Sequence, residues 1–504
     1  MHKLATVSLT ALALAACSQG EENIVEVFEP VLVSAEDCST LDASVLGADD
    51  ASAQWGEAAE GSPAYCEVTG TLSPVEGSTI GVVYRLPAEW NGKLLGLGGG
   101  GWAGNVTLQA ATDGLTKGFG TMQTNGGNAG TDVWANSWVV DRPASAEDFS
   151  HRAIHEMTVA GKKLASAFYG QDHRTAIFQG CSTGGRMALM EAQRYPEDYD
   201  AIIAGAPVYT LQVQTSAIFR NQTFARENGA GGFSPADLQL VQDAALAACD
   251  ANDGLEDGLI NDPRSCSFDV ASLQCDGAKT DSCLAAPQVA AMSQAYSGTR
   301  ASDGSWSMFP MSRGGEAGWA FFVGTDGTGN DPTGGGGLAN LFPLFFGDSN
   351  VTIQNFTEAN YLTVRGSEFA DMYEAKNPDL SPFFERGGKL MLWHGESDPG
   401  PSPVGSNAYA LSVLETNAEA ADQFRYFLLP GVGHCAGGPG ADTVDYLGAM
   451  DAWVSGGSAP ERLIGSKMDG SLTRPHCSWP NVAKYSGQGD ANDPESWTCQ
   501  ARSS

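Results

Sequence analysis

A serine between two glycines is the strongest chemical signal in this sequence. Gly180, Ser182 and Gly184 form the pattern Gly-x-Ser-x-Gly, which places a serine hydroxyl on a tight turn between a strand and a helix. The apolar run Thr175–Phe178 predicts a buried strand before it, and residues 186–195 have helical spacing after it. This context favours a nucleophilic serine over the alternative, a glycine- and serine-rich connecting loop.

Cys181, next to the serine, is an alternative nucleophile. Centring the pattern on Cys181 would put Gln179 and Thr183 at the glycine positions. The register therefore favours Ser182, and Cys181 needs another role.

A serine nucleophile of an α/β-hydrolase is followed along the chain by an acid and then a histidine, each in a loop after a strand. The predicted strand Lys389–Gly395 leads to Asp398, and the predicted strand Phe424–Leu429 leads to His434. We therefore expect His434 to be the base and Asp398 to orient it.

Each of these two assignments has a competitor nearby. Glu396 lies in the same loop as Asp398, and His394 lies on the acid's own strand. The spacing His-Gly-x-x-Asp-Pro favours Asp398 as the acid. The position of His394 on that strand predicts a residue that lines the substrate pocket.

Four glycines follow the predicted strand Lys93–Leu97. Glycine allows backbone N–H groups to approach a ligand closely. In an α/β-hydrolase one oxyanion-hole donor comes from this loop and the other from the residue after the nucleophile. We expect these donors to be Thr183 and the stretch that contains Gly100 and Gly101. A phosphate-binding loop is excluded because no Gly-Lys-Ser/Thr follows.

The remaining elements suggest an α/β chain with an insertion. Ile80–Leu86 predicts a strand, 148–168 a helix that carries His151 and His155 as surface or supporting groups, and 408–414 and 443–454 further helices. From about residue 209 to residue 376 the alternation of strands and helices stops, and the sequence is irregular and rich in aromatic residues. We expect hydrolase parts at 34–208 and 377–504, with a lid domain at 209–376.

The N-terminus predicts export. Residues 1–16 have a basic start and a short apolar stretch, as in a signal peptide. The sequence that ends at Cys17 resembles a bacterial lipobox, which implies lipidation of Cys17, a polar tether at 17–33 and, from Ser18, sorting to the outer membrane. Ordinary secretion to the periplasm or the medium is the alternative.

Charge and cysteine content agree with an exported protein. The net charge of −33 disfavours nucleic-acid partners and favours solubility. Without Cys17, ten of the 11 cysteines remain, an even number in an oxidising compartment. Cys181 precedes the proposed nucleophile and Cys435 follows the proposed base, so a disulfide between them would hold both groups at working distance.

Together, Gly-Cys-Ser-Thr-Gly-Gly, a later Asp398 and then His434-Cys435 resemble the tannase and feruloyl esterase family. This family includes the mono(hydroxyethyl) terephthalate hydrolases. The resemblance spans roughly Cys38 to Cys499. It implies an α/β-hydrolase fold with a large lid, and a serine esterase that hydrolyses hydroxycinnamoyl or galloyl esters.

The resemblance also implies a structural Ca²⁺ in the lid and four further disulfides. Three carboxylates on a tight loop suit a hard cation, although an acidic surface turn is the alternative; Leu255 stands where an EF-hand needs glycine. The implied ligands are Asp250, Asp253, Leu255, Asp257 and Leu259. The implied pairs are Cys38–Cys66, Cys249–Cys266, Cys275–Cys283 and Cys477–Cys499.

The acyl group is the least determined feature. Family members specific for terephthalate use a lid arginine, and here Arg313 and Arg365 are the candidates. Because no motif selects either one, we rank a feruloyl or galloyl esterase above a terephthalate or phthalate monoester hydrolase. A calcium-dependent surface binding protein on a hydrolase scaffold is the alternative of another class.

Overall fold

The computed structural model describes residues 28–225, 232–320 and 335–502. The predicted signal peptide and Cys17 lie outside these ranges, as does part of the aromatic-rich stretch, Phe321, Phe322 and Gly334 included. Within the described residues, no helix is both long and apolar enough to span a membrane.

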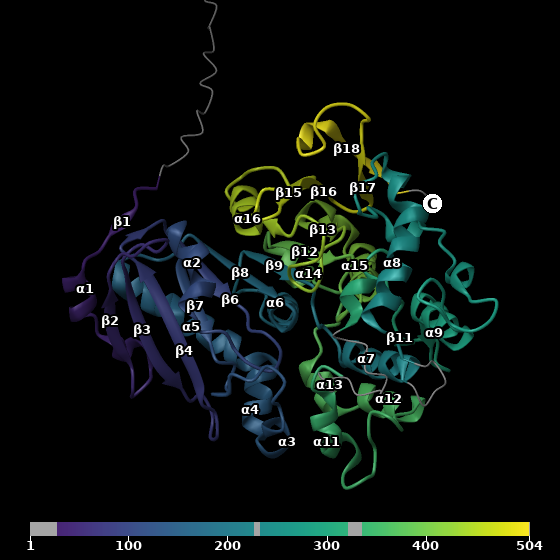
Figure 1. Cartoon of the computed structure of the whole chain (residues 1–504). Coiled ribbons are helices and arrows are strands. Elements are labelled where there is room, and N and C mark those ends of the chain that lie inside the picture. Colours follow the sequence, from purple (N-terminus) through teal and green to yellow (C-terminus); the bar gives the residue numbers. More distant parts are fainter. Residues whose placement is uncertain (1–27, 226–231, 321–334, 503–504) are drawn as a thin grey trace, which may run out of the picture.

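A nine-stranded mixed sheet forms the centre of the molecule (Figure 1). The first six strands in its spatial order are parallel, and the last three are antiparallel. In spatial order the strands are β13 (Phe424–Leu429), β12 (Lys389–Gly395), β9 (Ala201–Gly205), β8 (Thr175–Cys181), β6 (Lys93–Leu97), β7 (Gly120–Thr124), β4 (Ile80–Pro87), β3 (Tyr65–Leu72) and β2 (Ser52–Gly56).

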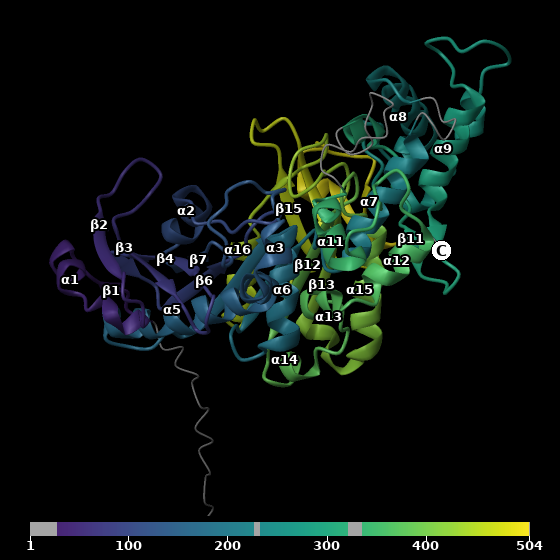
Figure 2. The same ribbon diagram turned by 90° about the horizontal axis from the view of Figure 1, so that it is seen from below.

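Helices cover both faces of the sheet, because neighbouring residues on a strand point to opposite sides. Leu95 and Met391 pack with α2 (Leu108–Thr116) and α16 (Tyr446–Val454). Leu94 and Leu390 face the other layer. That layer consists of α5 (Ala153–Tyr169), α6 (Thr183–Arg194), α14 (Ser381–Glu385) and α15 (Pro403–Thr416). Figure 2 shows α2 and α5 on opposite sides of β4, β6 and β7.

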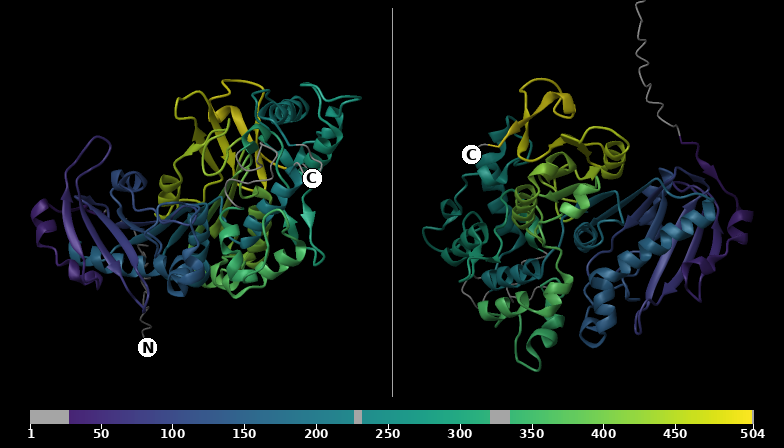
Figure 3. Two further views of the ribbon diagram at one scale, coloured as in Figure 1. Left: turned by 60° about the horizontal axis from the view of Figure 1, so that its bottom comes forward. Right: turned by 180° about the vertical axis from the view of Figure 1, so that it is seen from behind.

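The segment 209–376, called here the inserted segment, leaves the sheet after β9 and returns before β12. Its described part has a core of its own, which includes Leu238, Met292 and Trp319. Figure 3 shows it at the opposite end of the molecule from β2 and β3. Its helices are α7 (Leu211–Phe224), α8 (Pro235–Cys249), α9 (Ala286–Ser297), α11 (Phe342–Phe346), α12 (Glu358–Arg365) and α13 (Glu368–Tyr373).

The C-terminal part adds strands that the sequence did not predict. They are β14 (Thr443–Val444), β15 (Arg462–Ser466) and β16 (Thr473–Cys477) in one small sheet, and β17 (Asn481–Tyr485) and β18 (Trp497–Ala501) in a hairpin. The hairpin contacts the 3₁₀ turn Asp250–Asp253, which follows α8 of the inserted segment (Figure 1).

Most of the predicted elements are present, with local corrections. β6, β12 and β13 have the predicted bounds. After β4, a two-residue strand that the sequence did not predict, Glu89–Trp90, pairs with Val31–Leu32. The predicted closing helix begins only at Tyr446, because the side chain of Asp445 caps it after β14.

Candidate active site

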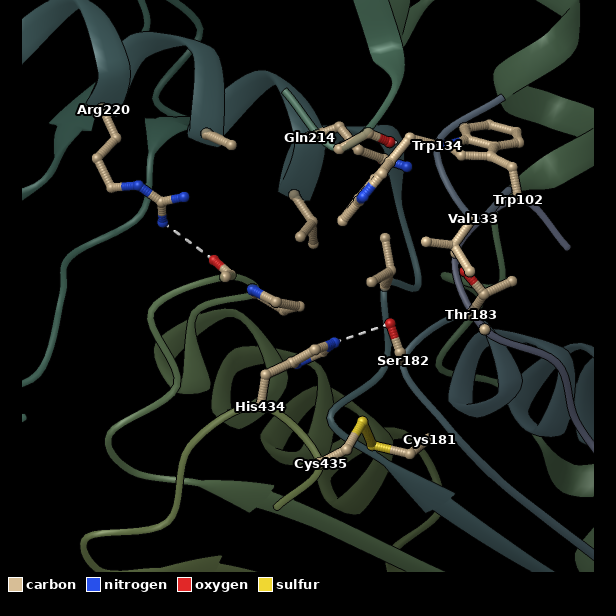
Figure 4. A pocket seen from close by; sticks show the side chains of 18 residues that line it. Trp102, Val133, Trp134, Cys181, Ser182, Thr183, Gln214, Arg220, His434 and Cys435 are labelled. Carbon is tan, nitrogen blue, oxygen red and sulfur yellow. Dashed lines mark hydrogen bonds between the residues drawn. A yellow bond between two sulfur atoms is a disulfide. The ribbon is translucent and has the colours of Figure 1, made fainter. Parts of the chain in front are cut away.

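Ser182 lies at the edge of a cavity of about 350 Å³ (Figure 4). Most of its wall is apolar side chain or glycine backbone, a composition typical of small-molecule sites. The lining residues come from both hydrolase parts and from the inserted segment. They are Gly100, Gly101, Trp102, Val133, Trp134, Cys181, Ser182, Thr183, Val208, Val213, Gln214, Ala217, Arg220, Gly336, Gly400, Pro401, His434 and Cys435.

The serine occupies a strained turn between β8 and α6. Its φ of 63° lies in the region that favours glycine. The Ser182 N–H donates to the carbonyl of Gly205 at 3.0 Å, and the Val208 N–H donates to the Ser182 carbonyl at 3.1 Å. A Cβ at Gly180 would lie 2.5 Å from the Gly184 backbone. The turn therefore requires both glycines and holds the serine hydroxyl toward the cavity.

His434 and Asp398 complete a hydrogen-bonded chain with this serine. His434 Nε2 lies 2.9 Å from Ser182 Oγ, and His434 Nδ1 lies 2.7 Å from Asp398 Oδ2. The Asp398 side chain is fully buried, and its other oxygen accepts the Gly400 N–H at 2.8 Å. The structure brings together the three residues that the sequence proposed as a triad.

Asp398 and His434 each stabilise the charged form of the other. Burial lowers the pKa of His434, but the charge of Asp398 and its hydrogen bond outweigh burial, so the pKa is raised overall. Burial likewise disfavours the charged form of Asp398. The neighbouring His434 and the hydrogen bonds from His394 and His434 outweigh it and hold the pKa of Asp398 well below its usual range. Asp398 therefore stays ionised beside the histidine.

A disulfide joins the residues that flank the serine and the histidine. Cys181 and Cys435 are bonded, with their Cα atoms 6.0 Å apart, across 254 positions of sequence. The structure contains this pair and also the four other pairs that the resemblance implied. Ser182 and His434 are thus tied together by a covalent bond next to each of them.

Backbone from two loops faces the serine. Thr183 is the first residue of α6, where N–H groups have no partner inside the helix and the helix dipole is positive. Gly100 and Gly101 line the same cavity after β6. The predicted oxyanion donors therefore all border the cavity of Ser182, and such donors stabilise a developing oxyanion.

The family model for tannase and feruloyl esterase matches residues 66–319 and 338–500. The chain belongs to the tannase and feruloyl esterase family. The protein is therefore a carboxylic ester hydrolase, and the α/β class expected from the sequence is confirmed.

Individual relatives agree with this assignment. An uncharacterised esterase of Xanthomonas campestris is 33% identical over 87% of this chain and 84% of its own length. The mono(2-hydroxyethyl) terephthalate hydrolase of Piscinibacter sakaiensis is 31% identical over 87% and 85%. The crystal structure of feruloyl esterase B from Aspergillus oryzae superposes with a TM-score of 0.81 at 26% identity, over 92% of this chain and all of the other.

His394 of this esterase does not line the cavity, contrary to the sequence-based prediction. It is fully buried, and its Nε2 lies 3.1 Å from Asp398 Oδ2 and 3.2 Å from the Pro401 carbonyl. Since both partners are acceptors, Nε2 carries a proton, and Nδ1 lies within hydrogen-bond distance of the Ser406 hydroxyl, at 2.8 Å. His394 is thus a second hydrogen-bond donor to the proposed catalytic acid.

Glu396, the alternative acid, turns away from His434. Its buried carboxylate lies 2.7 Å from the Arg264 guanidinium. The His434 ring contacts Asp398 instead, so the spacing argument selected the residue that the geometry also selects.

The two arginines proposed for substrate binding lie away from the cavity. Arg313 donates to the Phe268 carbonyl and stacks over Tyr296. Arg365 pairs with Asp303 at the surface. A different arginine, Arg220 on α7, lines the cavity.

Sequence reasoning missed Arg220, since one arginine on a helix carries no motif. The Arg220 guanidinium donates to the Gly400 carbonyl at 3.0 Å. Figure 4 shows it on the His434 side of the cavity, with Trp102, Val133 and Thr183 on the other side. Trp134 was also missed, because a single tryptophan carries no motif either, although it lines the cavity.

The proposed calcium loop follows α8. Asp250 accepts the N–H groups of Asp257 and Gly258, and Asp257 pairs with Arg474. Asp253 Oδ2 is buried and has no hydrogen-bond donor among the described residues. Burial, together with the charges of Asp257 and Asp250, raises the pKa of Asp253 to about 7.

A hard cation beside Asp253 would satisfy this oxygen and offset the carboxylate repulsion, so the chemistry of the loop fits Ca²⁺. In the part of the chain that the structure describes, however, no three acidic, histidine or cysteine side chains converge on one point. The loop would have to draw its carboxylates together around the ion.

Proposed function

We propose that the protein hydrolyses esters of aromatic acids through an acyl-enzyme on Ser182. The observation that carries this proposal is the hydrogen-bonded chain from Ser182 through His434 to Asp398, placed at the edge of a mainly apolar cavity. A serine hydroxyl is a weak nucleophile unless an adjacent base accepts its proton, and His434 Nε2 is within reach.

The geometry supports a two-step reaction. Ser182 Oγ attacks the ester carbonyl carbon while its proton passes to His434 Nε2. The oxyanion forms beside the N–H groups of Thr183 and of Gly100 or Gly101. As the tetrahedral intermediate collapses, the carbonyl–alkoxy bond breaks and His434 gives its proton to the leaving alcohol. Water then attacks the acyl carbonyl carbon while His434 takes one of its protons. The bond from the acyl carbon to Ser182 Oγ breaks, His434 returns the proton to Oγ, and the acid leaves.

The cavity wall supports an aromatic acyl group. Trp102, Trp134, Val208 and Val213 line the cavity that holds Ser182, and flat aromatic rings pack well on such surfaces. The solved relative from Aspergillus oryzae is a feruloyl esterase. Hydroxycinnamoyl or galloyl esters are therefore the substrates we propose first.

The test compares Ser182→Ala with the unchanged enzyme on methyl ferulate and methyl gallate. We expect turnover to fall by about a thousandfold or more, with the Tm preserved. An aliphatic ester such as methyl hexanoate tests the aromatic preference through kcat/KM. Undiminished turnover by Ser182→Ala would overturn the proposal.

Phosphonate labelling separates the esterase from the alternative of a surface binding protein. An esterase with this triad forms a covalent adduct on Ser182, and Ser182→Ala forms none. Absence of labelling in the unchanged protein would favour the binding-protein alternative.

A second candidate substrate class is the monoester of an aromatic diacid. The observation in its favour is Arg220, whose guanidinium places positive charge in the cavity wall. The terephthalate hydrolase at 31% identity points in the same direction. The test is mono(2-hydroxyethyl) terephthalate against its neutral methyl ester. Arg220→Gln should remove any preference for the charged ester, and Arg365→Gln, at the surface, should leave it unchanged.

We further propose that the inserted segment holds a structural Ca²⁺ and that the protein is exported. Asp250, Asp253, Asp257 and the carbonyls of Leu255 and Leu259 would hold the ion, which would order the loop without entering the reaction. Five disulfides support export. Anchoring through a lipid on Cys17 is the form of export that the sequence favours, and mass spectrometry of the mature N-terminus tests it.

A further inference from the structure

The loop that carries Asp398 contains a second buried carboxylate. Glu396 is fully buried, two residues before Asp398, and its N–H donates to the Leu429 carbonyl at 2.8 Å. Burying a charge is costly unless it is paired. Glu396 therefore needs partners of opposite charge to remain buried in this loop.

Two arginines from distant parts of the chain meet at Glu396. Arg264 lies in a short 3₁₀ helix of the inserted segment, and its Nη2 is 2.7 Å from Glu396 Oε1. Arg502 follows β18, and its Nη2 is 3.6 Å from the same oxygen. Arg502 also pairs with Asp262 of the inserted segment. Both guanidinium groups lie over the ring of Trp479, with their Cζ atoms 5.7 and 4.8 Å from the ring centroid.

Only Ser397 separates Glu396 from Asp398 along the chain. The Ser397 N–H donates to the Val432 carbonyl at 2.9 Å, and the Asp398 N–H donates to Gly395 at 3.2 Å. On the outer side, a Cβ at Gly315 of the inserted segment would lie 2.6 Å from Ser397 Cβ. The inserted segment therefore packs directly against this loop as well as pairing with it.

We propose that Glu396 is a positioning residue through which Arg264 and Arg502 hold the loop that places Asp398 on His434. This inference rests on the proposed roles of Ser182, His434 and Asp398. Glu396 itself touches no reacting atom. Its loss lets the loop relax, so that Asp398 no longer holds the His434 ring at the serine, and misplacement of about 1 Å can cost about a hundredfold in rate.

The experiment uses Glu396→Gln, which keeps the shape of the side chain and removes its charge, and Arg264→Gln. Glu495→Gln, which breaks the exposed pair with Arg462, is the matched control. Kinetics on methyl ferulate are measured well below the Tm of each variant. We expect kcat to fall at least about tenfold for Glu396→Gln and Arg264→Gln, with KM changed less than twofold. Glu495→Gln should match the unchanged enzyme.

Two further variants separate positioning from stability alone. The double variant Glu396→Gln/Arg264→Gln should lose no more kcat than the worse single variant, because both remove the same pair. Arg264→Lys, which keeps the charge, should retain more kcat than Arg264→Gln. If Glu396→Gln does not fold, this comparison of the two Arg264 variants tests the proposal in its place. Unchanged kcat with only a lower Tm overturns the positioning role. If Ser182→Ala itself keeps turnover, the proposed function fails instead.

Discussion

Asp398 is held by more donors than His434 alone. Its two oxygens accept hydrogen bonds from His434, His394 and the Gly400 N–H. A buried carboxylate with several donors stays ionised and keeps one orientation. Removing these donors one at a time therefore tests which of them the reaction needs.

Loss of the His394 donor should slow the reaction. His394→Asn removes the Nε2–H that reaches Asp398, and we expect kcat to fall about tenfold, within the range for a lost hydrogen bond to a charge. His394→Gln, whose amide nitrogen extends to a similar point, should retain more activity. His476→Asn, at a buried histidine bonded to Ala441, is the control. Equal kcat values for the Asn and Gln variants would contradict the donor role.

The pH dependence of the reaction follows from the raised pKa of His434. The neutral ring must accept the serine proton, so kcat/KM falls as the pH falls through the His434 pKa. Because Asp398 raises this pKa, the acid limb should lie above the ordinary histidine value of about 6.5. Asp398→Asn should move the limb to lower pH and lower kcat about ten-thousandfold. A pH–rate profile of both enzymes measures the shift, and an unmoved limb would assign it to another group.

At the scale of elements, the sequence predicts the strands that matter for the triad. β12 and β13 have the expected bounds, because strands buried on both faces are short continuous apolar runs. The motif at Ser182 and the strand ends at Asp398 and His434 then determine where the chemistry lies. These are local signals, and a parallel sheet brings its strand ends to one edge.

The cavity wall and the C-terminal strands depend on contacts that the sequence does not display. Gln214 and Arg220 reach the cavity only because α7 docks with one face toward the serine. β15 pairs on one side with β14, which is only two residues long, and on the other with β16. His394 was misassigned because its position on β12 was known but the direction of its ring was not.

The Cys181–Cys435 disulfide links the turn that carries Ser182 to the loop that carries His434. Replacing both cysteines with serine should lower kcat about tenfold or more at a temperature where the protein stays folded, because the bond ties the nucleophile turn to the histidine loop. Replacing Cys275 and Cys283 with serine removes a disulfide of the inserted segment that lies outside the cavity wall. That variant should lose stability, by about 2–5 kcal/mol, while it keeps its kcat. Similar kcat losses in both double variants would contradict a local role for the first bond.

For the whole molecule, polar contacts join the inserted segment to the C-terminal strands of the second hydrolase part. Arg474 of β16 pairs with Asp257 of the proposed calcium loop, and Asn261 of the inserted segment donates to the Ala483 carbonyl of β17. The Arg264, Arg502 and Glu396 cluster lies in the same region. A change in the calcium loop should therefore affect the stability of more than its own segment.

Calcium removal tests this coupling. Because a ligand that binds only the folded state stabilises it by about 2.7 kcal/mol at a hundred times its Kd, we expect EDTA to lower the Tm by a few °C and Ca²⁺ to restore it better than Mg²⁺. Asp253→Asn should abolish this response, since its buried oxygen lacks another partner among the described residues. Asp281→Asn, an exposed acidic residue of the same segment, should preserve the response. A Tm that ignores both EDTA and Ca²⁺ would leave the loop as an acidic turn held by Arg474.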